Sequence, residues 1–186
     1  MAYNNLSSSS PKHQEKHGLI IRLAHAGLAI AVINQLLTSL VLEAPAPDAT
    51  GNWYFEVHEY GGLFGFGFVL LFWLGLLVKL RESPLGLLFP WFSGERLSAL
   101  WADIKHHARF LIKFQFPPYE NHAPLASAVH GLGLLLITAM ASSGTIYYFI
   151  NNGNPDAGGL VGVVMFIHKT LASLVWAYLV GHAGLA

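Results

Sequence analysis

The chain has 186 residues, of which 54% are hydrophobic and only 11% charged, and its ten Lys and Arg residues balance its ten Asp and Glu residues. This composition lies outside the range of soluble domains and is typical of membrane proteins, and we expect no nucleic-acid partner. The chain contains no cysteine, which excludes disulfides, iron–sulfur clusters held by thiolates and zinc sites built from cysteine.

The N-terminal part combines a polar tail with an apolar stretch. Residues 1–17 are polar and include a serine run, so they predict a disordered tail. Residues from about 18 to 42 are apolar, with Arg22 and His25 in the first two helical turns. This stretch is too long for the hydrophobic region of a signal peptide and shows no obvious small-residue cleavage site. We therefore expect a retained membrane helix.

Three further apolar stretches follow, at about 57–79, 124–150 and 161–186. Each is long enough to cross a bilayer as a helix. Histidine occurs in all of them: His58 opens the first, His130 lies near the start of the second, and His168 and His182 lie in the third. The sequence thus predicts an all-α membrane protein, a four-transmembrane-helix bundle formed by residues 18–186.

The long polar connection between the second and third stretches contains a segment with helical periodicity, at about 95–114. Its apolar residues recur at three- and four-residue steps, with cations beside them. This pattern predicts an amphipathic helix in the cytoplasmic interface. The helix either anchors the connection to the membrane or covers a quinone site.

The distribution of cations predicts the orientation in the membrane. Nine of the ten Lys and Arg residues precede or begin the first apolar stretch, or lie at the end of the second or in the connection after it. The positive-inside rule makes that side cytoplasmic, so both termini are expected inside and the protein is expected to be a multi-pass protein of the bacterial cytoplasmic (inner) membrane. The loops on the opposite side contain no Lys or Arg, and the acids near that side are Glu43, Asp48, Glu56, Glu59 and Asp156. This acidic side is either a docking face for a cationic redox protein or a consequence of the topology rule, which excludes cations there.

This orientation sorts the histidines by depth. His168 and His182 are fourteen residues apart, so they share nearly one helix face and are separated by about 21 Å along the axis. His25 matches the depth of His182, and His58 matches that of His168. Histidine inside a membrane is costly without a partner. The sequence therefore predicts two metal centres, most simply two b haems, with His25 and His182 as the inner ligand pair and His58 and His168 as the outer pair.

Other residues near these pairs have two interpretations. Gly61, Gly62 and Gly65 share the helix face of His58, either to admit a porphyrin or to let two helices pack closely. His130 lies at the depth of the inner pair. It could replace an inner ligand, bond a haem propionate or face a quinone, or it could simply bond a backbone carbonyl or water.

The histidine-bearing segments resemble the bacterial cytochrome b561 family and the b-type cytochrome subunits of nickel–iron hydrogenases and similar membrane dehydrogenases. The matching pieces are Arg22-Leu23-Ala24-His25, Val57-His58-Glu59, Ile167-His168-Lys169-Thr170-Leu171-Ala172 and Gly181-His182-Ala183, together with His130, Gly144 and Asn152-Gly153-Asn154-Pro155. The resemblance implies a four-helix bundle that holds two b haems on His25, His58, His168 and His182.

The resemblance also implies electron transfer between a periplasmic redox partner or dehydrogenase subunit and the quinone pool. Bis-histidine ligation suits this role because it leaves no open position on the iron. A stand-alone superoxide:quinone oxidoreductase of the same family is an alternative, so whether the chain is itself an enzyme stays open. A haem-free proton-relay transporter or scaffold is a second alternative, but the expected spans lack the buried carboxylates and mid-span prolines that it needs.

Overall fold

The computed structural model describes residues 19–78, 86, 88–115, 123–151, 154 and 157–185. The predicted tail, residues 1–17, lies outside the described residues. Apart from an isolated bridge between Ala46 and Ala49, the regular structure of the described residues is helical. This confirms the all-α prediction for this part of the chain. The elements are α1 (Leu19–Ser39), α2 (Trp53–Val78), the 3₁₀ helix η1 (Pro90–Phe92), α3 (Gly94–Leu111), α4 (Pro124–Ile150) and α5 (Gly159–Leu185).

Among the described residues, three helices are long and apolar enough to cross a membrane: α2, α4 and α5, over Trp53–Val78, Pro124–Ile150 and Gly159–Ala183. The chain itself covers little of their apolar surface, since only 11% to 22% of the most apolar 18-residue stretch of each helix is buried. In water such exposure would be prohibitive, whereas lipid solvates it. The long apolar helices and their exposed surface indicate a membrane protein.

The expected fourth span corresponds to α1, which is not among these three helices. It ends at Ser39 rather than near residue 42. Its 21 residues still extend for about 31 Å, close to the thickness of the hydrocarbon core. Helix α1 also packs along α2. That α1 crosses the membrane as the fourth helix of the bundle stays a prediction.

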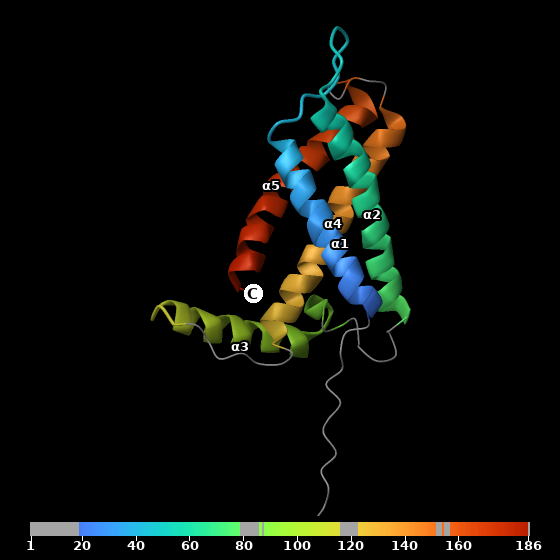
Figure 1. Ribbon diagram of the computed structural model, residues 1–186. Helices are drawn as coiled ribbons and strands as arrows, with labels where there is room; N and C mark the ends of the chain where they lie inside the picture. Colours follow the sequence, from blue (N-terminus) through green and yellow to red (C-terminus); the bar gives the residue numbers. More distant parts are fainter. Residues whose placement is uncertain are drawn as a thin grey trace, which may run out of the picture.

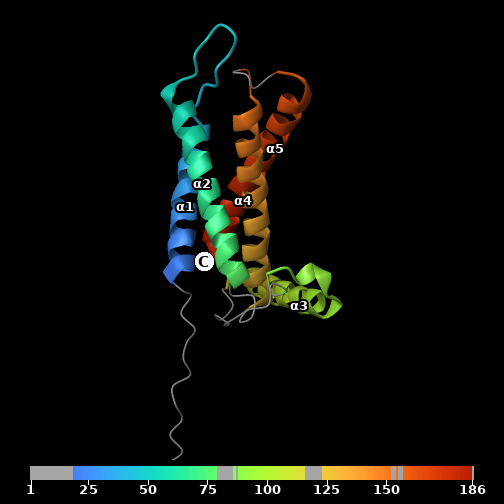
Figure 2. The ribbon, with the colours of Figure 1, turned by 90° about the vertical axis from the view of Figure 1, so that its right-hand side faces the viewer.

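The long helices stand side by side, and α3 lies across one end of them (Figure 1 and Figure 2). The major packing pairs are α1 with α2, α2 with α4, and α4 with α5, while α3 packs against the start of α4. We call the end with α3 the α3 end and the opposite end, where residues 40–52 lie, the loop end. The described part of α1 begins at the α3 end, and α5 finishes there (Figure 1).

Helix α2 begins at Trp53, four residues before the predicted start at 57. Asn52 explains the difference. Its Oδ1 accepts hydrogen bonds from the backbone N–H groups of Phe55 and Glu43, at 3.1 Å each, and its Nδ2 donates to the carbonyl of Val41. A side-chain oxygen that accepts from the third residue on is a helix N-cap. His58 consequently lies in the second turn of α2.

Candidate functional site

The two rings of the predicted outer pair, His58 and His168, lie edge to face near the loop end. His58 comes from the second turn of α2, and His168 comes from α5, nine residues after its start. Their ring centroids are 6.3 Å apart and their planes are nearly perpendicular, at 84°. Two imidazoles that bind one metal ion from opposite sides have centroids roughly 6 Å apart, given a metal–nitrogen bond of about 2.0 Å. The spacing of the two rings therefore matches that of two axial ligands of a haem iron.

Each of these rings has a second contact, through its Nδ1 atom, with a hydroxyl group on a neighbouring helix. The His58 Nδ1 is 2.9 Å from the Thr38 Oγ1 of α1. The His168 Nδ1 is 2.9 Å from the Ser143 Oγ of α4. Sequence analysis missed both hydroxyls, because they lie 20 and 25 residues from their histidines and no local spacing links them. The available signal was a polar residue inside an apolar helix.

Gly144 allows His168 to approach α4. A Cβ atom at Gly144 would lie 3.0 Å from the His168 Cε1, closer than carbon atoms normally approach. The missing side chain lets the ring lie against the backbone of α4, next to Ser143. The histidine of α5 is thus positioned by two consecutive residues of α4.

The three glycines on the face of His58 pack against α1. Added Cβ atoms at Gly61 and Gly62 would meet the side chains of Asn34 and Gln35, and one at Gly65 would be 3.3 Å from the Ala31 Cβ. Close packing of α1 and α2 is therefore what these glycines provide in the structure. Contact between these residues and a haem stays a prediction.

Three histidines gather at the α3 end. The His182 ring of α5 is 5.1 Å from the His130 ring of α4, at 86°, and it stacks on Tyr178 at 5.3 Å and 10°. His182 also interacts electrostatically with both His130 and His25. The structure thus places the His182 and His130 rings in contact. His25 lies six residues after the start of α1, at the same end of the bundle, and which of these histidines would bind a haem stays a prediction.

The neighbours of His130 and Tyr178 complete this end of the site. The His130 Nδ1–H donates to the carbonyl of Ala126, at 2.7 Å, which is the backbone bond that we considered for it. This bond leaves the Nε2 of His130 available. The Tyr178 hydroxyl lies against Gly133 of α4. Tyr178 therefore occupies the space between α4 and α5 beside His182, another feature that sequence analysis missed.

Among the described residues, no group of three or more His, Asp or Glu side chains is arranged to hold a metal ion by itself. Haem does not need such a group, because the porphyrin supplies the equatorial ligands and the protein supplies only the axial ones. The donor set that is present, a pair of facing imidazoles in an apolar bundle, therefore fits haem better than a free metal ion.

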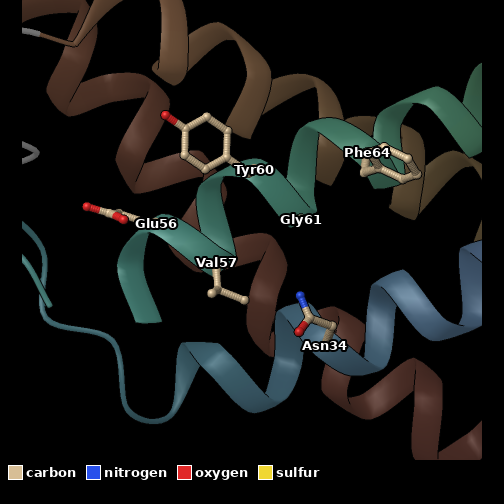
Figure 3. A pocket seen from close by; sticks show the side chains of 6 residues that line it. All are labelled: Asn34, Glu56, Val57, Tyr60, Gly61 and Phe64. Carbon is tan, nitrogen blue, oxygen red and sulfur yellow. The ribbon is translucent and has the colours of Figure 1, made fainter. Parts of the chain in front are cut away.

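A separate hollow of about 420 Å³ opens on the surface between α1 and α2. It is lined by Asn34, Glu56, Val57, Tyr60, Gly61 and Phe64. Figure 3 shows Asn34 of α1 opposite Val57 and Gly61 of α2. Neither His58 nor His168 lines this hollow, so it is distinct from the histidine site.

Comparison with known proteins identifies a family. A family model described as prokaryotic cytochrome b561 matches residues 16–186. The match includes all the histidines discussed above and every described helix. No curated protein and no solved structure matches the chain.

Proposed function

Because the chain belongs to the prokaryotic cytochrome b561 family and is therefore a membrane b-type cytochrome that transfers electrons, we propose that it holds two b haems. We further propose that it moves electrons across the bacterial inner membrane between a periplasmic redox partner or dehydrogenase subunit and the quinone pool. The observation that supports this most directly is the contact between the His58 and His168 rings, whose centroids lie at the spacing of two axial ligands. When bound, each haem supplies an iron that accepts and releases one electron.

The two proposed haems would be held by different parts of α5, since His168 lies nine residues after its start and His182 three residues before its end. His168 with His58 would hold the haem at the loop end, and His182 with His25 would hold the haem at the α3 end. The fourteen residues between His168 and His182 separate the two ligands by about 21 Å, most of the hydrocarbon thickness. Helix α5 thereby contributes a ligand to each haem, and an electron would need to cross only the space between them.

The haem-to-protein ratio tests this assignment. Purified wild-type protein should show two b haems per chain in a dithionite-reduced minus oxidised spectrum. His58→Ala or His168→Ala should leave one haem, because an iron that loses an axial imidazole loses most of its attachment. A wild-type preparation that is folded and free of haem would contradict the proposal.

The same measurement decides the ligands at the α3 end. We expect His25→Ala and His182→Ala each to lose one haem, and His130→Ala to keep both. If His130→Ala loses a haem while His25→Ala does not, then His130 is the ligand. The loss of a haem at the loop end in any of these three variants would indicate general unfolding instead.

The proposed partner side is the loop end. Its described loop, residues 40–52, contains the acids Glu43 and Asp48 and no Lys or Arg, and Glu56 lies in the first turn of α2 at the same end. An acidic face attracts a cationic redox protein and raises its rate of encounter. Reduction of the loop-end haem by such a protein should therefore slow as ionic strength rises. A rate that does not depend on salt would rule out this steering.

A further inference from the structure

We propose that Thr38 and Ser143 are positioning residues for the loop-end haem. Each would hold one axial histidine as the tautomer with the proton on Nδ1, so that both Nε2 atoms are free to bind iron. This inference rests on the proposed haem at His58 and His168. It goes further by assigning two hydroxyl groups, on two other helices, a role in setting the chemistry of the ligands.

The burial of these hydroxyls is unusual for the molecule. Thr38 and Ser143 are the two buried polar residues in the described part of the chain, and each is only 7% exposed. Most other polar side chains of the long helices face outward or lie only partly buried. A buried hydroxyl is stable only when it is hydrogen-bonded. Both of these use their bonds in the same way.

The hydroxyl protons are already engaged by the backbone. The Thr38 Oγ1–H donates to the carbonyl of Asn34 at 2.7 Å, with the carbonyl of Gln35 at 3.1 Å. The Ser143 Oγ–H donates to the carbonyl of Met140 at 2.8 Å. A hydroxyl has one proton and two lone pairs. Each oxygen therefore faces its histidine as an acceptor, and the histidine Nδ1 must be the donor.

This arrangement has two consequences for the iron. A proton on Nδ1 leaves the lone pair on Nε2, and the hydrogen bond makes the ring a stronger donor and fixes its orientation. Because Thr38 belongs to α1 and Ser143 to α4, the two rings are held independently. Their planes can therefore stay at 84° rather than rotate together.

The test compares variants of the two hydroxyls with matched controls. Thr38→Val keeps the shape and removes the acceptor, Ser143→Ala removes only an oxygen, and Thr38→Ser restores the hydroxyl. Ser39→Ala and Thr170→Val are the controls, since those hydroxyls bond the carbonyls of Leu36 and Phe166 in the same manner and contact neither histidine. The midpoint potentials of both haems and the rate of haem transfer to excess apomyoglobin are measured on the purified holoprotein.

Thr38→Val and Ser143→Ala should raise the potential of the loop-end haem, because a weaker donor stabilises ferric iron less. They should also speed the loss of that haem by roughly 10- to 100-fold, the usual cost of losing an outer partner of a metal ligand. Thr38→Ser and the two controls should behave as wild type. The haem at the α3 end should keep its potential in every variant, which shows that the protein is folded.

The positioning role is overturned if the loop-end potential and haem loss of both variants match those of the controls. It is also overturned if both haems shift together, since that would indicate loosening of the whole bundle. Failure of the proposed function looks different. In that case the wild type lacks the loop-end haem, or His58→Ala retains it, whatever the hydroxyl variants do.

Discussion

At the scale of single residues, the site depends on neighbours of the histidines that would not bind iron themselves. His58 and His168 are the proposed haem ligands, but Thr38 and Ser143 form hydrogen bonds with their rings, and Gly144 leaves space for the His168 ring. A histidine in a membrane helix has few polar neighbours and no water. Its rotamer and its tautomer are therefore set by the one or two side chains that reach it. Small changes at those neighbours should alter the cofactor site.

Gly144→Ala should weaken binding of the loop-end haem. The added Cβ would lie 3.0 Å from the His168 Cε1, so the ring must move, and overpacking of this kind costs about 1–3 kcal/mol. Since about 1.4 kcal/mol corresponds to a tenfold change, haem titration of the apoprotein should show a loss of about tenfold at this site. Gly67→Ala is the matched control, because a Cβ at Gly67 would meet nothing within 4 Å. Equal affinities of the two variants would contradict the role of Gly144.

At the scale of elements, the ends of the helices are fixed by side chains from outside them. Because the Asn52 side chain caps α2, the helix begins earlier than the apolar pattern of the sequence predicts. The start of α4 has no cap from its own Ala123. Instead, the Asp103 Oδ2 of α3 accepts from the backbone N–H of Leu125 at 2.8 Å, and the His107 Nδ1 lies 3.0 Å from the other oxygen of the same carboxylate. A carboxylate at a helix N-terminus accepts a hydrogen bond from a backbone N–H that has no partner within the helix, and its negative charge interacts favourably with the helix dipole. Helix α3 is thereby joined to the membrane helices.

Asp103→Ala should loosen the first turn of α4. Loss of a capping acceptor typically costs about 0.5–2 kcal/mol. If the turn opens locally, hydrogen exchange of the Leu125 amide should become roughly 2- to 30-fold faster. Asp103→Asn keeps an acceptor oxygen at the same reach and should retain most of the protection. If exchange in Asp103→Ala equals that of the wild type, then the contact does not stabilise this turn.

At the scale of the whole molecule, charge follows the two ends of the helices. The described cations at the start of α1 and in or directly after α3 lie at the α3 end: Arg22, Arg96, Lys105, Arg109 and Lys113. The 40–52 loop at the other end contains Glu43 and Asp48 and no cation. The described part of α1 begins at the α3 end and α5 finishes there. The positive-inside rule then predicts that this end faces the cytoplasm.

Single cysteines can test this orientation without background, because the chain contains no cysteine. In intact cells, a membrane-impermeant maleimide should label Asp48→Cys and should not label Arg109→Cys until the cells are lysed. Both positions are exposed in the structure, so a difference in labelling reports the side of the membrane. The opposite pattern would reverse the orientation and move the proposed docking face to the cytoplasm.

For the described part of the chain, the sequence by itself determined the all-α class and the three long apolar helices, and it also determined the family. Its haem-binding histidines stay a prediction. These could be read from the chain because lipid requires long uninterrupted apolar helices, and because a histidine in such a helix stands out. The segment predicted at 124–150 coincides with α4. The predicted start of α2, at about residue 57, was wrong, because the apolar pattern does not reveal that Asn52 caps the helix at Trp53.

Only the tertiary structure decided which side chains meet. The 6.3 Å approach of His58 and His168, their bonds to Thr38 and Ser143, and the gathering of His130 with His182 each join different helices. The glycines on the face of His58 illustrate the same point, because periodicity placed them on one face but not against α1. Periodicity fixes the faces of each helix separately. The neighbour of a face depends on how the helices pack and rotate against one another, which is a property of the folded chain.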